Sequence, residues 1–419
     1  MQLAFERWTQ GRTVSTLGTN SGSEPLPFQQ WRNFKEAFAP ELVARAVAES
    51  GRRVRRCIDP FGGSGTTALT CQFLGVEPVT IEVNPYLADL IEAKLTPHDP
   101  GALLRDFRRL KRLVRQPRQY DLSHLPPTFV EPGVGGRWIF TAEVAQRIEC
   151  YRSAICRLDS RASQLFFRAL LGGVIVGVSN VLVSGKGRRY RQNWMSRQAV
   201  ASDVDDAVLA HIEKALIEVT THAIRPARAY TLLRGDSRVR LPEVPRADLA
   251  VFSPPYPNSF DYTDVYNVEL WMLGYLSDAK SNRALRQSTL TSHVQVSRVY
   301  SQKPSGSAKL DLVSERLHSE TSRLWNRNIP SMVDAYFYDM KKILHELHGK
   351  LYANGEVWAV VGDSLYNGVH VPVAEVLEEL GAGVGYTSVV KEAFRSMRSS
   401  AQQGWRAELS ETLLVLRKK

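Results

Sequence analysis

Asp59-Pro-Phe-Gly-Gly-Ser-Gly-Thr-Thr67 lies between two apolar stretches, Val54–Ile58 before it and Ala68–Leu74 after it. The stretch before it has the length of a buried strand, and the stretch after it reads as an apolar helix. Glycines let a backbone approach a ligand closely, and the N-terminus of a helix presents free N–H groups. The segment therefore predicts a strand, a glycine-rich turn and a helix that together hold a ligand at the turn.

The same alternation of strands and helices recurs along the chain. A strand at Val79–Val83 precedes a helix near Tyr86–Leu95, and a helix marked by Pro40 is expected over 31–49. Further strand-length apolar runs are Tyr230–Leu233, Leu249–Phe252, Val357–Val361, Tyr386–Val390 and Thr412–Leu416. Strands that alternate with helices are typical of a parallel α/β sheet, and this pattern predicts seven strands in all.

The glycine-rich turn restricts the class of ligand. No lysine follows Gly65, so the G-x-x-x-x-G-K-[ST] pattern of a phosphate-binding loop is absent, and the G-x-G-x-x-G spacing of dinucleotide binders is absent as well. Glu82 closes the second strand, 17 residues after Gly65. A carboxylate at that position accepts hydrogen bonds from both ribose hydroxyls of a nucleoside. The pair predicts a ligand that contains adenosine and lacks a pyrophosphate.

A second motif, Ser253-Pro-Pro-Tyr256, follows the strand Leu249–Phe252. Two prolines end the strand and fix an extended backbone without N–H groups, which leaves the Ser253 hydroxyl and the Pro254 carbonyl as acceptors. The exocyclic amine of cytosine or adenine is a poor nucleophile, and two acceptors on its hydrogens would direct its lone pair at a methyl donor while Tyr256 stacks on the base. A structural turn is the alternative interpretation of this motif alone.

The two motifs together resemble those of S-adenosylmethionine-dependent DNA amino-methyltransferases. Asp59–Thr67 resembles the cofactor loop of that family, Ile81-Glu-Val-Asn-Pro85 the motif that follows it, Phe34–Val43 the segment before it, and Ser253–Tyr256 the catalytic motif. The resemblance implies a Rossmann-like seven-stranded methyltransferase sheet with a helical insertion and a final antiparallel hairpin. It implies catalytic roles for Ser253, Pro254, Pro255 and Tyr256, and S-adenosylmethionine binding by Phe38, Asp59, Phe61, Gly63, Gly65, Thr66, Thr67, Glu82 and Asp236.

The resemblance also orders the candidate reactions. Serine in the first place of the catalytic motif favours N4 of cytosine over N6 of adenine. Methylation at C5 of cytosine is rejected, because none of the four cysteines follows a proline. An N6-adenine enzyme, an RNA or protein-glutamine methyltransferase, and a non-catalytic DNA-binding subunit with a methyltransferase fold remain as alternatives. Asp261 and Tyr262 are second-tier candidates for lining the active site.

Charge and composition indicate where DNA binds. The chain has 54 basic and 43 acidic residues, a net charge of +11, which suits a polyanionic partner. A flexible run at 184–191 offers Lys186, Arg188, Arg189 and Arg191 to a phosphate backbone. The chain is divided into an N-terminal arm and cofactor half (1–99), a helical insertion (100–229) and a catalytic half (230–419). A duplex base must be flipped to react, and either the insertion or the stretch 277–328 reads the target sequence.

The remaining expectations concern the cellular setting. Residues 1–30 read as a loosely held arm, and the apolar segment Leu165–Val183 reads as a buried helix, since it contains Arg168 and three glycines. No Cys-x-x-Cys pair occurs, so no metal ion is expected and a cytoplasmic location is predicted. Double-stranded DNA is the expected partner. The resemblance adds a restriction–modification or phage-defence setting, with a cognate restriction endonuclease or defence-system subunits as further partners.

Overall fold

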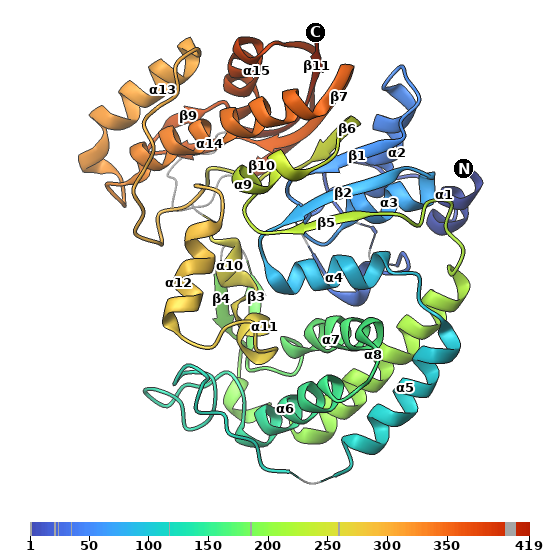
Figure 1. Cartoon of the computed structure of the whole chain (residues 1–419). Helices are drawn as coiled ribbons and strands as arrows, with labels where there is room; N and C mark the ends of the chain where they lie inside the picture. The colour runs from blue at the N-terminus through green and yellow to red at the C-terminus, as the bar shows by residue number, and fades with distance from the viewer. Residues whose placement is uncertain are drawn as a thin grey trace.

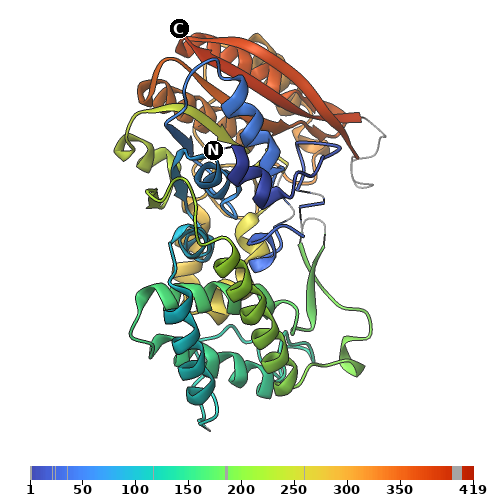
Figure 2. The ribbon, with the colours of Figure 1, turned by 90° about the vertical axis from the view of Figure 1, so that its right-hand side faces the viewer.

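The computed structural model describes residues 2–20, 22–23, 25–34, 36–116, 118–184, 187–258, 260–398 and 408–419. It consists of a seven-stranded sheet with helices on both faces and a helical lobe beside it (Figures 1 and 2). The order of the strands is β10-β11-β7-β6-β1-β2-β5. Their bounds are β1 Arg56–Asp59, β2 Glu77–Glu82, β5 Thr231–Arg234, β6 Ala247–Phe252, β7 Leu351–Gly362, β10 Tyr386–Arg398 and β11 Glu408–Lys418.

Each of the seven expected strands is present in this sheet. The strands β5, β2, β1, β6 and β7 are parallel, whereas β11 runs antiparallel to both β7 and β10. The chain builds outward from β1 through β2 to β5 and then crosses back to β6, which lies on the other side of β1. This reversal between β1 and β6 is the switch point of a doubly wound sheet, where ligands bind at the carboxyl ends of strands. The predicted Rossmann-like fold with a final antiparallel hairpin is confirmed.

The centre of the sheet is buried on both faces. All six residues of β6 are buried, and they alternate: Leu249 and Val251 pack with one apolar cluster, Ala250 and Phe252 with another. The first face is covered by α2 Pro40–Glu49 and α3 Thr66–Leu74, and the second by α14 Ile329–Lys350 and α15 Val373–Val384 (Figure 1). The apolar side chains of α4 Pro85–Leu95 belong to the cluster that α3 shares with the helical lobe. Pro40 is the first residue of α2, so the helix forms over only the second half of the predicted range 31–49.

The lobe below α4 is helical, as expected for residues 100–229 (Figure 2). Its helices are α5 Pro100–Leu113, α6 Ala142–Cys156, α7 Arg161–Ile175 and α8 Ala201–Thr221. Residues 260–276, which the sequence places in the catalytic half, pack into the apolar core of this lobe through Phe260, Tyr266 and Trp271. This segment carries α10 Tyr262–Val265 and α11 Asn267–Met272. Residues 260–276 thus pack with the lobe although they follow the predicted boundary at 229–230, and the division of the chain into three parts stays a prediction.

One local expectation is wrong and a second holds only in part. The first residues form α1 Gln2–Thr9 instead of a loose arm, and the fully buried Trp8 stacks on Phe73 of α3 with ring centroids 4.6 Å apart. The helix expected over Leu165–Val183 ends at Ile175, and Val181–Ser184 is strand β3. Within the described part of the chain, no helix has the length and apolarity that a membrane crossing requires.

The remaining elements are short or peripheral. They are the hairpins β3 Val181–Ser184 with β4 Gly187–Tyr190 and β8 Ser364–Tyr366 with β9 Val369–Val371, and the helices α9 Ser237–Arg240, α12 Ala279–Ser288 and α13 Ala308–Ser319. Short 3-10 turns occur at η1 Gln29–Trp31, η2 Trp194–Ser196, η3 Leu241–Glu243 and η4 Thr321–Arg323.

Candidate active site

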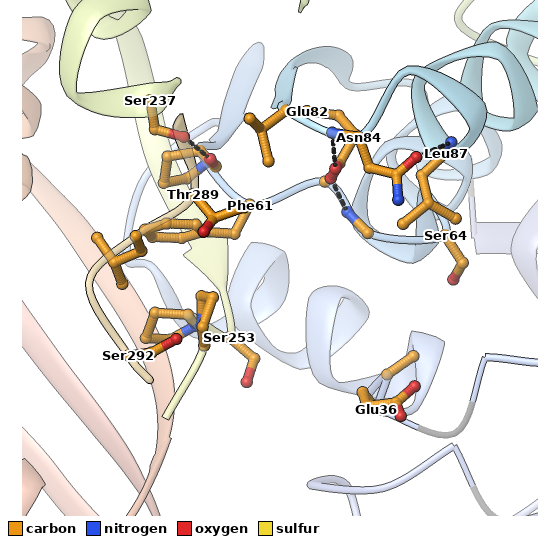
Figure 3. Close-up of a pocket in the computed structure, with 18 of the residues that line it drawn as sticks. Glu36, Phe61, Ser64, Glu82, Asn84, Leu87, Ser237, Ser253, Thr289 and Ser292 are labelled. Carbon is orange, nitrogen blue, oxygen red and sulfur yellow. Dashed lines mark hydrogen bonds between the residues drawn. The ribbon is translucent and has the colours of Figure 1, made fainter. Parts of the chain in front are cut away.

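A cavity of about 460 Å³ opens at the carboxyl ends of β1, β2 and β6. Asp59, Glu82 and Phe252 end these three strands, and the segments that follow them line the cavity together (Figure 3). The predicted residues on its wall are Phe38, Asp59, Phe61, Gly63, Thr66, Thr67, Glu82, Asp236, Ser253, Pro254, Pro255 and Tyr256. The fold thus brings the glycine-rich loop and the Ser253–Tyr256 motif, far apart in sequence, into one site.

The glycine-rich loop is held by Glu82. The Gly63 N–H donates to Oε2 of Glu82 at 2.7 Å, and the Asn84 N–H donates to Oε1 at 2.7 Å. Gly63 has a φ of 53°, and a Cβ there would lie 3.1 Å from Cζ of Phe34. Only glycine adopts this backbone without strain, so the loop stays close to the carboxylate. Gly65 lies outside the cavity wall; with a φ of 83° it forms the N-cap of α3.

Two buried carboxyl groups face the cavity. Burial raises the pKa of Asp59 to about 7, although the Phe61 N–H and the Thr67 side chain stabilise its charged form. Burial likewise raises the pKa of Glu82 to about 7. Burial disfavours the charged form of each acid, and a cationic or multiply donating ligand would restore it. These groups fit a ligand that has two hydroxyls and a positive charge, as S-adenosylmethionine has.

The Ser253–Tyr256 motif is tied to the last strand of the sheet. The Ser253 hydroxyl donates to the Tyr256 hydroxyl oxygen at 3.3 Å, and the Tyr256 hydroxyl donates to Oε1 of Glu411 at 3.0 Å. Glu411 pairs with Gly362, the last residue of β7, because β11 is antiparallel and enters the sheet at the carboxyl ends of the parallel strands. Glu411 was not among the predicted site residues. Its only signal in the sequence is its place before the apolar run Thr412–Leu416.

Asp236 lines the cavity but is engaged by its own helix. Its Oδ1 accepts from the Arg238 N–H at 2.9 Å, and Nη2 of Arg238 donates to its Oδ2 at 2.7 Å. Arg238 also pairs with Asp339 at 2.6 Å. The hydrogen bond that Asp236 would accept from the cofactor therefore stays a prediction, since the carboxylate already caps α9.

The segment after α12 forms another part of the wall, which sequence reasoning had placed only in a general recognition stretch. Ser288, Thr289, Leu290, Ser292 and His293 all line the cavity, and Thr289 and Ser292 lie beside Phe61 (Figure 3). The Thr291 N–H donates to Oδ2 of Asp339 at 3.1 Å, which ties the segment to α14. Burial lowers the pKa of His293 to about 4.

Of the two second-tier candidates, Asp261 is not among the residues that line the cavity. Asp261 is the N-cap of α10 and forms an ion pair with Arg286, so its carboxylate serves the local structure. Burial opposes its charged form, but His293 and Arg286 hold its pKa below the ordinary value. The backbone of Tyr262 begins α10, and its side chain lies outside the described part of the structure.

In the predicted DNA-contact run at 184–191, Ser184 ends strand β3 and Gly187–Tyr190 is strand β4, which pairs with it. Lys186 falls outside the described residues. Arg191 donates to the carbonyls of Ser179 and Val176, both at 2.9 Å, and the Arg188 guanidinium lies 6.0 Å from the centroid of the Phe129 ring. Arg189 is exposed. Two of the three described arginines therefore contact the lobe itself, and binding of DNA by this run stays a prediction.

The strand order and the position of the cavity define a Rossmann-like fold of the methyltransferase type. No family model matches the chain. The Type II methyltransferase M.AvaI of Nostoc sp. is 25% identical over 398 residues, which cover 86% of this chain and 79% of M.AvaI. The Type II methyltransferase M.BsoBI of Geobacillus stearothermophilus is 22% identical over 426 residues, which cover 89% of this chain and 81% of M.BsoBI. Over most of its length, the chain is thus similar to two Type II methyltransferases.

A shorter match has higher identity. The Type II methyltransferase M.SmaI of Serratia marcescens is 38% identical over 84 residues, which cover 20% of this chain and 26% of M.SmaI. Among solved structures, TrmN from Thermus thermophilus is 10% identical with a TM-score of 0.33, and the match covers 95% of this chain and 53% of that protein.

Proposed function

We propose that the chain is a DNA methyltransferase that moves a methyl group from S-adenosylmethionine to the exocyclic amine of a flipped base, N4 of cytosine before N6 of adenine, in a restriction–modification system. One observation carries the proposal: the glycine-rich loop, Glu82 and the Ser253–Tyr256 motif line a single cavity. Similarity to Type II methyltransferases over most of the chain supports DNA as the substrate.

The cofactor half of the cavity would bind the nucleoside by charge and hydrogen bonds. Both oxygens of Glu82 already accept backbone N–H groups, and each carboxylate oxygen has a second lone pair for a ribose hydroxyl. Phe61 and Phe38 supply apolar walls. When bound, S-adenosylmethionine supplies an electrophilic methyl group on a positively charged sulfur. The buried carboxylate of Asp59 favours that charge over a neutral ligand.

The catalytic half would position the amine. Pro254 and Pro255 remove two backbone donors, so the wall beside the amine presents acceptors. The Ser253 oxygen and the Pro254 carbonyl hold the amine hydrogens, which aligns the nitrogen lone pair with the methyl group. Flipping the base costs a few kcal/mol of stacking and pairing energy. Stacking of the flipped base on the Tyr256 ring regains about 1–3 kcal/mol of this cost.

The decisive test is transfer of a labelled methyl group from S-adenosylmethionine to unmethylated genomic DNA, followed by digestion to nucleosides and mass spectrometry. We expect N4-methylcytosine. N6-methyladenine would overturn the cytosine preference and leave the enzyme class intact. Label in RNA but not in DNA would overturn the DNA substrate. Cofactor binding without any transfer would identify a non-catalytic subunit.

The matched control is Ser253→Ala, which removes the hydroxyl acceptor and leaves the backbone in place. We expect transfer to fall by roughly ten- to a hundredfold, because a lost hydrogen bond to a reacting group costs about 1–3 kcal/mol. Affinity for S-adenosylmethionine should stay unchanged, since Ser253 holds the base rather than the nucleoside. Equal loss of binding and transfer would contradict the role assigned to Ser253.

A further inference from the structure

A second cavity lies at the opposite edge of the sheet from the candidate active site. It has a volume of about 1020 Å³ and is lined from four segments: 50–56 before β1, 246–248 at the start of β6, 352–354 at the start of β7, and Arg417 near the end of antiparallel β11. The active-site cavity lies at the carboxyl ends of the same parallel strands. The six residues of β6 separate the two edges by about 17 Å, at about 3.3 Å per residue.

The wall of this second cavity is strongly basic. Its charged residues are one acid, Asp248, and the arginines Arg52, Arg53, Arg55, Arg56, Arg246 and Arg417, which define the arginine cavity. Three of the arginines are held by acids: Arg52 by Asp248 at 2.9 Å, Arg56 by Glu77 at 2.8 Å and Arg417 by Glu356 at 2.7 Å. These pairs fix the wall and neutralise half of its positive charge.

The other three arginines carry uncompensated charge. Arg53, Arg55 and Arg246 are exposed, and none forms an ion pair with an acid among the residues that the structure describes. Arg246 is oriented by Tyr352, whose ring centroid lies 4.8 Å from its guanidinium. Unpaired guanidinium groups with a planar fork of donors match the oxygens of phosphate groups. The arginine cavity is therefore built for an anionic, phosphate-bearing ligand.

Exposure of these three arginines favours an extended ligand over a small one. A pocket for a small molecule encloses most of its ligand, whereas exposed cations contact a partner that remains outside the protein. We propose that the arginine cavity binds the phosphate backbone of a double-stranded DNA segment other than the one whose base enters the active site. The choice of DNA as the polyanion rests on the proposed function. A duplex seated at the carboxyl edge does not reach the amino edge without a sharp bend, so the bound segment is a flanking or a second one.

The test compares two triple variants of the full chain. R53Q/R55Q/R246Q removes the unpaired charges of the arginine cavity. The matched control R7Q/K342Q/K391Q removes three exposed charges that lie outside the arginine cavity and outside both predicted recognition regions, 100–229 and 277–328. Binding of a fluorescent duplex of arbitrary sequence is measured at several salt concentrations. Each lost phosphate contact reduces the magnitude of the slope of log K against log salt by about 0.9. The slope of the cavity variant should therefore be smaller in magnitude by roughly two to three, and the control should keep the slope of the wild type.

Three outcomes would overturn the proposal. They are an unchanged slope in the cavity variant, an equal loss in both variants, and displacement of the duplex by adenosine monophosphate at constant ionic strength. Anionic phospholipid vesicles are a second probe. If the vesicles bind the wild type but not the cavity variant, and both proteins show the same slope with DNA, the surface binds a membrane and the proposal fails. Methyl transfer by the wild type is measured separately. If the wild type transfers no methyl group but the salt slopes of the wild type and the cavity variant differ as expected, only the proposed function is contradicted.

Discussion

The Tyr256 hydroxyl donates to the Glu411 carboxylate at 3.0 Å and joins the Ser253–Tyr256 motif after β6 to the first residues of β11. The two residues are 155 positions apart. They meet because β11 runs against β7 and begins where the parallel strands end. Glu411 thereby orients the tyrosine ring that we propose to stack on the flipped base.

This contact predicts a graded response at Tyr256. Tyr256→Phe keeps the ring and loses one hydrogen bond, worth about 0.5–1.5 kcal/mol, so methyl transfer should fall by roughly two- to tenfold. Tyr256→Ala also loses stacking, so transfer should fall by a further ten- to a hundredfold. Initial rates with labelled S-adenosylmethionine measure both. Equal rates for the two variants would show that the ring does not stack on the base.

A double-mutant cycle isolates the same contact. Glu411→Gln weakens the hydrogen bond by removing the negative charge and keeps the shape of the side chain. The double variant Y256F/E411Q should deviate from additivity by about 0.5 kcal/mol or more, as residues in contact do. Additive losses in the transfer rate would mean that the two residues act independently.

Cofactor binding should depend on pH through the acids of the loop. The pKa of Glu82 is raised to about 7 by burial, so the group is protonated below that pH and loses an acceptor and a negative charge. Affinity for S-adenosylmethionine should therefore rise by up to about tenfold from about pH 6 to about pH 8.

Calorimetric titration measures this dependence, and two controls accompany it. Glu82→Gln should flatten the dependence but leave a remainder, because Asp59 has a pKa of about 7 as well. The neutral product S-adenosylhomocysteine should show a weaker dependence than the cationic cofactor. Affinity that falls as the pH rises would contradict the assignment of these carboxylates to the methyl donor.

Gly63 should tolerate no side chain without loss of the cofactor. In Gly63→Ala the new Cβ meets Phe34 at 3.1 Å on a backbone with a φ of 53°, so the loop must shift away from Glu82. We expect at least tenfold weaker cofactor binding, equal to about 1.4 kcal/mol. Gly11→Ala is the matched control, since it has a φ of 63° and open space around it. Weakened cofactor binding in the control would point to a general effect on folding.

The helical lobe should be held to the sheet domain by glycine contacts in α7. A Cβ at Gly172 would lie 2.3 Å from the ring of Tyr86 in α4, so Gly172→Ala forces two packed helices apart and should cost about 1–3 kcal/mol of folding stability. Gly349→Ala in the last turn of α14 meets no atom within 4 Å and should stabilise by at most about 1 kcal/mol. Thermal unfolding measures both, and an unchanged midpoint for Gly172→Ala would contradict the close packing.

The strands and the cofactor loop could be predicted from sequence because their causes are local. A run such as Leu249–Phe252 is apolar at every position since it is buried on both faces, and the glycines at 62, 63 and 65 mark a turn whose backbone excludes side chains. Glu82 followed from its place at the end of a strand. These features depend on neighbours within a few residues.

The errors arose where distant segments meet. The buried surface of Trp8 becomes apparent only when α1 lies on Phe73, and the helix predicted to reach Val183 stops early because Val181–Ser184 pairs with β4. The wall formed by Thr289 and His293 depends on anchoring to α14 through Asp339. No local pattern encodes such partners.

The amino-acid sequence by itself determined the seven strands, the glycine-rich turn and the residue types of the two motifs, since hydrophobic period and backbone freedom are properties of short segments. Only the tertiary structure decided that Glu411 reaches Tyr256 and that six arginines gather at the far edge of the sheet. The position of Glu411, and that of Arg417 among the six arginines, depends on the direction of β11, which results from its pairing with β7 and β10. The other five arginines meet because the parallel strands β1 and β6 begin at the same edge of the sheet.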